Sequence, residues 1–422
     1  MNVNSVENKK VALVLGGTTP HKYLIENLKD RAYYTILVDY NKKPPAACVA
    51  DLHLKESALD KVKVEEIAVE YKASLVISVA LDQPLPVAIE VAEKLNLPTP
   101  FSLNTALNLT NKGRMKSVLA AYGVDTPESQ FISPEDSDSF CNIECPLVIK
   151  PEDSTGSRGI TIANQGNVLK KALTTACKFS STGRAIAEKY ITGKEIAVDA
   201  IVHKNKIKVL LCRERYKQSI TKEEHPIQCV ATISPANISE EEIKKIKNCA
   251  KKINEAFKIH NGVFHIQGIL DECGNFKVIE VAGRVSGGPG GFYAIKNKTG
   301  IDLINYFLDC YLDEAGEEHP TNNNKFYATG SMYCKEGIMG SFSNVHDLID
   351  TGVLDSYNPY KNPGDPIPSG FTTKNRVAGY AVSANSREEL KDKLDRLYEL
   401  IDVLDDRGHS ILLKEIGVHR CL

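Results

Sequence analysis

The segment Gly262–Arg284, with the sequence GVFHIQGILDECGNFKVIEVAGR, decides which fold we predict for this chain. It contains two runs in which apolar and polar residues alternate, Val263–Leu270 and Phe276–Val281. Between them lies a turn with Gly and Asn at Glu272–Asn275. Two alternating runs separated by such a turn predict a β-hairpin.

The register of this hairpin brings two metal-capable side chains together. A symmetric loop at the turn places Gln267 directly opposite Glu280. Opposed side chains on one face of an antiparallel pair have Cβ atoms roughly 4.5–5.5 Å apart, close enough for their oxygens to hold one Mg²⁺. Arg284 and the glycine-rich turn Ser286–Gly291 follow. This combination suits a site where metal-bound phosphate is transferred.

The composition is that of a globular protein. The chain has 422 residues, of which 42% are hydrophobic and 25% charged, so it is long enough for two or three domains with real cores. A net charge of −2 gives no reason to expect nucleic acid or an anionic membrane as a partner. The polar N-terminus does not resemble a signal peptide, and no window approaches the ~20 apolar residues of a membrane helix.

The eleven cysteines are scattered without a CxxC pair. Several lie in strand-like runs such as VLLC, where we expect a reduced and mostly buried thiol. The cysteine pattern therefore predicts no structural zinc and a cytoplasmic location.

The first hundred residues alternate strand and helix. Strand-like runs VALVLGG, TILVDY and SLVISVA are separated by helical patterns at about His21–Asp30, Val64–Tyr71 and Pro86–Leu95. This order predicts a parallel sheet, and we assign residues 1–104 to a Rossmann-like α/β domain. Gly16, Gly17 and Asp39 follow strands as in a dinucleotide-binding fold, but the GxGxxG fingerprint is missing. We therefore prefer a domain whose strand ends line a shared cleft over one that binds a nicotinamide cofactor.

The remainder of the chain predicts two α+β parts. Residues 105–316 form one domain, with a lobe at about 145–192, and residues 317–422 form a C-terminal domain. Ser239 with Glu242, and Ser386 with Glu389, have the spacing of capping boxes and open the two longest helical patterns.

A loop rich in Gly and Ser follows the strand-like run LVIK. Such a loop is more often a turn than a phosphate-binding site, but Lys150 at the end of the strand places a positive charge beside its N–H groups. The loop contains Ser154, Gly156 and Ser157, which we expect to hold phosphate. No GK[ST] follows, so the loop is not a Walker A motif.

Five segments, in this order, resemble the ATP-grasp superfamily: NKGRMK, PLVIKPEDSTGSRGI, AEKYITGKEIAVD, NGVFHIQG and VIEVAGR. The resemblance covers nearly the whole chain. It is greatest for the carboxylate–amine ligase branch, which includes L-amino acid ligases, while biotin carboxylase and purine-pathway ligases share the architecture. The fold implied is a Rossmann-like domain, two α+β lobes that grip ATP and a C-terminal α+β domain.

The resemblance also implies roles for individual residues. Lys112 corresponds to a lysine that reaches the ATP phosphates, and Lys150 to one between adenine and the α-phosphate. Arg284 corresponds to the arginine that holds the transferred phosphate, so Arg284 and Lys112 are the expected catalytic residues. The remaining expected nucleotide contacts are the loop residues Ser154, Gly156 and Ser157, the inter-lobe segment with Glu188, Lys189 and Ile191, and Glu195 at the ribose.

The two hairpin positions correspond to metal ligands that are usually both acidic. Glu280 fits this pattern and Gln267 departs from it, since a glutamine offers one neutral carbonyl oxygen. The family often has Asn two residues after the second acid, where this chain has Ala282. The expected cofactors are ATP and Mg²⁺, with Mn²⁺ as an alternative metal, and the number of metals stays open.

Weaker candidates lie nearby. His265 shares a strand face with Gln267 and either faces the cleft or is a core histidine. Arg213, Arg215 and His225 fall in the part that covers the substrate in related ligases, and we expect the segment 214–228 to be a mobile lid.

The expected function is an ATP-dependent ligase that activates a small-molecule carboxylate as an acyl phosphate and joins it to an amine. We expect a homodimer without nucleic-acid or membrane partners. An ATP-grasp carboxylase, a phosphotransferase, and a nucleotide-binding protein with a weakened metal site are the alternatives. The sequence does not name the acid or the amine.

Overall fold

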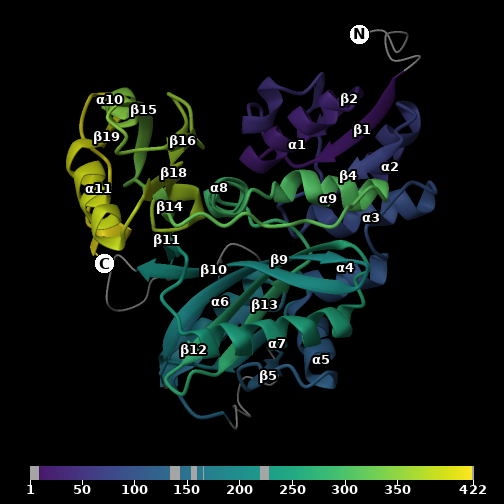
Figure 1. Cartoon of the computed structure of the whole chain (residues 1–422), viewed down its shortest axis with the longest axis horizontal. Helices are drawn as coiled ribbons and strands as arrows, with labels where there is room; N and C mark the ends of the chain where they lie inside the picture. Colours follow the sequence, from purple (N-terminus) through teal and green to yellow (C-terminus); the bar gives the residue numbers. More distant parts are fainter. Residues whose placement is uncertain (1–8, 134–142, 154–158, 165, 219–227, 421–422) are drawn as a thin grey trace.

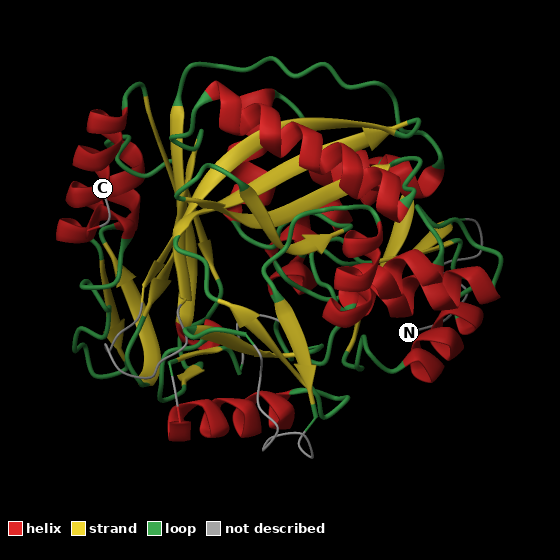
Figure 2. Cartoon of the chain, turned by 90° about the horizontal axis from the view of Figure 1, so that it is seen from below, coloured by secondary structure: helices red, strands yellow, loops and turns green. Residues whose placement is uncertain are grey.

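The computed structural model describes residues 9–133, 143–153, 159–164, 166–218 and 228–420. Figure 1 shows three regions around a common centre: the N-terminal residues in purple, the middle of the chain in blue and teal below them, and the C-terminal residues in yellow-green. In Figure 2 the strands meet in the middle of the molecule and helices lie around the outside. None of the helices in these ranges is long and apolar enough to cross a membrane.

The N-terminal region is a parallel sheet in the order β3-β2-β1-β4, flanked by helices, as predicted. The Val and Leu residues of β1, β2 and β4 are buried, because both faces of a parallel sheet are covered. Helix α1 begins at Thr19, two residues earlier than predicted. The elements are β1 (Lys10–Leu15), α1 (Thr19–Asp30), β2 (Tyr33–Val38), β3 (Leu52–Leu54), α2 (Lys61–Glu70), β4 (Leu75–Ile77) and α3 (Pro84–Lys94).

Two helices, α4 (Leu103–Thr110) and α5 (Lys112–Ala121), lead into a small antiparallel sheet in the order β5-β8-β6-β7. One amphipathic helix, α6 (Gly166–Phe179), covers it and contributes Ala172, Leu173 and Ala176 to its core. The strands are β5 (Ser129–Ile132), β6 (Leu147–Pro151), β7 (Thr161–Ala163) and β8 (Ala185–Lys189).

An eight-stranded sheet, ordered β13-β12-β9-β10-β11-β14-β18-β16, runs through the rest of the molecule. Because β11 pairs with β14, the sheet passes without a break from the middle of the chain into the C-terminal region. The strands are β9 (Gly193–His203), β10 (Lys206–Gln218), β11 (Gln228–Ser234), β12 (Gly262–Asp271), β13 (Phe276–Ala282), β14 (Phe326–Tyr333), β16 (Ser356–Pro359) and β18 (Arg376–Ala384).

The two faces of this sheet differ in polarity because side chains alternate along each strand. On one face, Ile196, Val198 and Ile266 pack with Ile246, Ala250 and Ile253 of helix α7 (Glu240–Phe257). Ser239 and Glu242 form the predicted capping box at the start of this helix. The other face carries the polar side chains of the candidate site.

The C-terminal region adds a three-stranded sheet and two helices. Ser386 caps helix α11 as predicted, but the Glu389 side chain accepts from the Asn385 N–H rather than from Ser386, so the reciprocal half of the predicted capping box is wrong. The elements are β15 (Gly337–Ser343), α10 (Val345–Asp350), β17 (Pro366–Ile367), α11 (Arg387–Leu400) and β19 (Asp402–Asp405).

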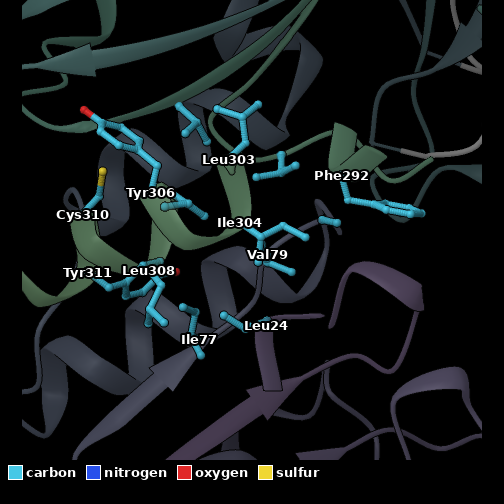
Figure 3. Close-up of a cluster of buried hydrophobic side chains, with 14 of the residues drawn as sticks. Leu24, Ile77, Val79, Phe292, Leu303, Ile304, Tyr306, Leu308, Cys310 and Tyr311 are labelled. Atoms are coloured by element: carbon cyan, nitrogen blue, oxygen red, sulfur yellow. The ribbon is translucent and has the colours of Figure 1, made fainter. Parts of the chain in front are cut away.

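Helix α9 (Leu303–Leu312) joins the N-terminal domain to the long sheet. Figure 3 shows its apolar side chains against Leu24, Ile77 and Val79 of the N-terminal domain. On its other side the Tyr306 hydroxyl donates to the Val202 carbonyl of β9 at 2.8 Å. Full burial of each large apolar side chain stabilises by about 1.5–3 kcal/mol, so this helix holds the two parts in place. A short helix, α8 (Ile295–Thr299), precedes it.

Candidate functional site

The predicted hairpin is confirmed as β12 and β13, and Gln267 pairs with Glu280. The Gln267 amide nitrogen lies 3.4 Å from Glu280 Oε2 and donates to it. The symmetric loop predicted from the sequence is wrong, because Leu270 pairs with Phe276 and the loop is one residue longer. A β-bulge at Ile279 absorbs the extra residue and restores the predicted pair.

A buried polar cluster lies beside this pair. His265 is opposite Asp199 of β9, and its Nδ1 lies 2.9 Å from Asp199 Oδ1. Arg213 of β10 donates from Nε to Asp199 Oδ2 at 2.7 Å and from Nη2 to Ser286 Oγ at 3.1 Å. The cluster therefore ties three strands to the start of the glycine-rich turn.

The charges in this cluster fix its protonation. Burial alone would raise the pKa of Asp199, but Arg213 and His265 outweigh it and lower the pKa to about 2. Burial lowers the pKa of His265 despite the nearby carboxylate. Asp199 is thus the acceptor, Nδ1 of a neutral His265 carries the hydrogen, and Nε2 is an acceptor. His265 is buried and also lines the cavity described below, so both interpretations from the sequence hold.

A second ion-pair cluster surrounds Glu195, whose side chain is 11% exposed. Arg215 Nε lies 2.7 Å from Glu195 Oε1, and Lys217 forms an ion pair with Oε2. These two cations lower the pKa of Glu195 against the opposing effect of burial. Residues 214–218 belong to strand β10, so this part of the predicted lid is a paired strand. His225 lies outside the described residues.

Arg284 follows β13 and reaches the N-terminal domain. Its Nε and Nη2 donate to Asp82 Oδ1 and Oδ2 at 2.6 and 2.5 Å, and its Nη1 donates to the Val285 carbonyl. Burial raises the pKa of Asp82, but the charge of Arg284 outweighs it and lowers the pKa. The guanidinium predicted to hold phosphate is therefore fixed by a carboxylate in this structure.

A third group gathers in the small sheet. Lys150 and Lys116 lie 2.6 and 3.0 Å from Glu188 Oε1, and all three side chains are buried. The two lysines lower the pKa of Glu188 although burial opposes them. Lys112, also buried, begins helix α5, and its N–H donates to the Glu152 carbonyl.

The segment after β8 is tied to its neighbours through the backbone. The Lys189 N–H donates to the Glu128 carbonyl at 2.9 Å, and the Tyr190 N–H to the Pro146 carbonyl at 3.0 Å. Because the Lys189 N–H already donates to Glu128, a nucleotide would contact the Lys189 carbonyl oxygen. Ile191 lies two residues later in the sequence. Ser154, Gly156 and Ser157 lie outside the described residues.

A cavity of about 770 Å³ brings part of the predicted site together. Gln267, His265 and Arg284 line it, as do the turn after β1 and several residues of the C-terminal region. Lys150 and Glu188 lie in the small sheet instead. Among the described residues, one set of predicted site residues therefore lines the cavity, and a second set lies in the lobe of residues 145–192.

Gln267 and Glu280 each carry a side-chain oxygen of the kind that binds a hard cation such as Mg²⁺, but the Gln267 amide here turns its nitrogen towards Glu280 and would have to turn its oxygen to the metal. One donor is charged and the other neutral, so the protein offers only part of a coordination shell. Over the ranges given above, no group of three or more His, Cys, Asp or Glu side chains could hold a metal. This arrangement fits a metal held largely by phosphate and water, and it does not fit a closed structural metal site.

Sequence reasoning missed Asp199 and Asp82. Asp199 could have been found, because the strand EIAVD places Glu195 and Asp199 on the same face at a period of two. Asp82 follows strand β4, and no local sequence pattern there indicates that it pairs with Arg284, 202 residues later.

Comparison with known proteins defines the class. The ATP-grasp domain family matches residues 143–291, the part that holds strands β6 to β8 of the small sheet, strands β9 to β13 of the long sheet, and Arg284. This chain therefore contains an ATP-grasp domain.

One curated relative is the arginine-specific large chain of mitochondrial carbamoyl phosphate synthase from Schizosaccharomyces pombe. It is 23% identical over 302 residues, which cover 68% of this chain and 25% of that protein. The chain thus spans about a quarter of the length of this relative.

Two solved structures share the fold over nearly the whole chain. The L-amino acid ligase from Bacillus licheniformis has a TM-score of 0.78 at 21% identity and covers 94% of this chain and 99% of its own. The second structure is the biotin carboxylase domain of 2-oxoglutarate carboxylase from Hydrogenobacter thermophilus, solved with MgADP and bicarbonate. It has a TM-score of 0.77 at 16% identity and covers 96% of this chain and 92% of its own. These likenesses confirm the predicted ATP-grasp fold.

Proposed function

We propose that this protein is an ATP-dependent ligase that joins a small-molecule carboxylate to an amine and releases ADP and phosphate. The observation that supports it best is a cavity lined by Gln267, the strand partner of Glu280, by Arg284, and by residues of the N-terminal and C-terminal regions. A cavity of about 770 Å³ is large enough for small-molecule substrates.

The nucleotide would bind between the small sheet and the long sheet. We assign Lys150 to the region between adenine and the α-phosphate, Lys112 to the ATP phosphates, and Ser154, Gly156 and Ser157 to the phosphate loop. Glu188, Lys189 and Ile191 would flank adenine, and Glu195 the ribose. Glu195 and Glu188 each already contact two cations, so these clusters would hold the nucleotide by exchanging some of those contacts.

Gln267 and Glu280 would hold Mg²⁺, or Mn²⁺ in its place. The bound metal would neutralise charge on the phosphates. The described residues contribute orientation: the β-sheet pairing of Gln267 and Glu280 keeps both side chains on one face, and Arg284 places a guanidinium at the cavity, where a phosphate would share it with Asp82.

The reaction we propose has two steps that balance. First, a substrate carboxylate oxygen attacks the γ-phosphorus of ATP, and the bond from that phosphorus to the β–γ bridging oxygen breaks. ADP is released, and the substrate becomes an acyl phosphate. The amine nitrogen then attacks the acyl carbon, phosphate leaves, and a proton is released from nitrogen. Most of the catalysis would come from fixed positive charge around the transferred group.

The domain limits of 1–104, 105–316 and 317–422 and a cytoplasmic homodimer are parts of this proposal. The biotin carboxylase domain with the same fold was solved as a dimer, and the even charge balance of this chain is consistent with small-molecule partners. The continuous long sheet means that the last two domains share a β-structure.

The test is a screen of amino acids and small carboxylates, alone and in pairs, for ADP release, with mass spectrometry of the products. Release that requires both an acid and an amine, with an amide formed, supports the proposal. ADP release with bicarbonate and a carboxylated product would indicate a carboxylase. A phosphorylated product without amide would indicate a phosphotransferase, and nucleotide binding without any ADP release would indicate a binding protein.

A further inference from the structure

The arginines that line the cavity differ in one respect. Arg213, Arg215 and Arg284 are each neutralised by a carboxylate, namely Asp199, Glu195 and Asp82. Arg376, the fourth arginine of the cavity wall, makes no ion pair with any carboxylate of the described residues.

Arg376 is nevertheless held in place. Its Nε donates to the Tyr333 hydroxyl at 2.7 Å, and its guanidinium carbon lies 5.5 Å from the centre of the Tyr333 ring. Tyr333 is fully buried, packs on Phe371 at 4.7 Å between ring centroids, and donates its hydroxyl hydrogen to the Cys229 carbonyl at 3.2 Å. The Tyr333 hydroxyl is therefore fixed in position and accepts the hydrogen bond from Arg376 Nε.

This anchoring leaves Nη1 and Nη2 of Arg376 without a hydrogen-bond partner among the described residues. Two coplanar donors on one guanidinium match the oxygens of a carboxylate or phosphate. Lys374, two residues earlier, also lines the cavity and adds positive charge at the same end of strand β18. The site is therefore prepared for an anion.

We propose that Arg376, positioned by Tyr333, binds a second anionic group on the substrate, so that the substrate class is a carboxylate that carries a further carboxylate or a phosphate. This inference rests on the proposed ligase function for the identity of the first group. Arg376 lies on β18 of the C-terminal region, whereas the residues assigned to the nucleotide lie between positions 112 and 195 of the sequence. The group it binds therefore belongs to the substrate.

The first experiment measures binding without turnover. Isothermal titration compares glutarate with its monoamide, and O-phosphoserine with serine, for the wild type and Arg376→Gln. We expect at least one dianionic probe to bind the wild type about tenfold or more tightly than its partner, as one charge-assisted contact warrants, and Arg376→Gln to abolish the preference. The carboxylate and phosphate pairs distinguish the two kinds of anion.

The matched control is Arg387→Gln. Arg387 also lies in the C-terminal region with its guanidinium carbon 5.5 Å from an aromatic ring centre, that of Phe326, and it donates to the Pro235 carbonyl, but it is not part of the cavity wall. This variant should keep the full preference. Arg376→Lys should retain part of it, and Tyr333→Phe should weaken it several-fold while Arg376 remains.

The outcomes separate this inference from the function on which it rests. No preference for either dianion in the wild type, or an unchanged preference in Arg376→Gln, overturns the inference even if ligase activity is found. A preference that disappears in Arg376→Gln, in a protein that never releases ADP, supports the anion site and contradicts the ligase.

Discussion

Arg284 and Asp82 form a two-point ion pair across 202 residues, with Nε–Oδ1 and Nη2–Oδ2 distances of 2.6 and 2.5 Å. Since Arg284 follows β13 and Asp82 follows β4, the pair joins the ATP-grasp domain to the N-terminal domain at the cavity. A phosphate that binds Arg284 must share this guanidinium with Asp82.

Arg284→Ala should lower turnover by roughly 10²–10³-fold, the usual cost of losing one preorganised group that stabilises the transition state, while ADP still binds. Steady-state kinetics and ADP titration measure the two effects. Because the variant leaves Asp82 buried without its partner, Arg284→Ala/Asp82→Ala serves as the folding control. Unaltered turnover in purified Arg284→Ala would refute the assignment.

Lys150→Ala should weaken ATP binding by about tenfold or more, because a buried charge-assisted contact to phosphate is lost. Lys189→Ala is the matched control, since that side chain is 43% exposed and forms a 3.6 Å ion pair with the exposed Glu144. Its proposed role uses the backbone, so the control should bind ATP normally. Calorimetric titration measures both, and equal affinities would contradict a nucleotide role for Lys150.

Asp199→Asn should lower the free energy of unfolding by about 3–5 kcal/mol at pH 7, because Arg213 stays buried without its carboxylate. The folded pKa of Asp199, about 2, lies below its ordinary 3.8, so the stabilisation is complete above pH 4 and is lost as the pH falls towards 2. Urea denaturation at pH 7 and pH 3 should show a smaller difference between variant and wild type at pH 3. The surface variant Asp395→Asn should change stability by less than about 0.5 kcal/mol, and a pH-independent deficit in Asp199→Asn would count against this charge cluster.

Glu280→Ala should abolish turnover, whereas Gln267→Glu should preserve it and lower the Mg²⁺ concentration required, because a second carboxylate attracts a hard cation more strongly. Without metal, two carboxylates in the place of the 3.4 Å contact should repel, so Gln267→Glu should also gain more thermal stability from Mg²⁺ with ADP than the wild type gains. A Mg²⁺ titration of activity and of Tm measures both. A higher metal requirement in Gln267→Glu would show that residue 267 is not a ligand.

Local patterns predicted much of this fold. The capping box that opens helix α7 depends on Ser239 and Glu242, three positions apart, so their spacing was sufficient. The bulge at Ile279 was not predictable in this way, because two errors of one residue, in the loop and in the strand, cancel at position 280.

The contacts between residues far apart in the sequence could not be predicted from spacing. Arg376 and Tyr333 are 43 residues apart, and only the pairing of β14 with β18 brings them together. The same holds for Asp82 with Arg284. Sequence reasoning named Arg213 and Arg284 but not Asp199 and Asp82, the carboxylates that neutralise them, and that information singles out Arg376.

The central claim is that the carboxylate is activated by phosphorylation before the amine attacks. Once the screen has found a substrate pair, the acid is supplied with both carboxylate oxygens as ¹⁸O, and the released phosphate and the amide are weighed by mass spectrometry. We predict one ¹⁸O in each phosphate and one in each amide, since one carboxylate oxygen leaves with phosphorus. Phosphate without ¹⁸O, released with stoichiometric amide, would contradict an acyl phosphate and with it the proposed mechanism.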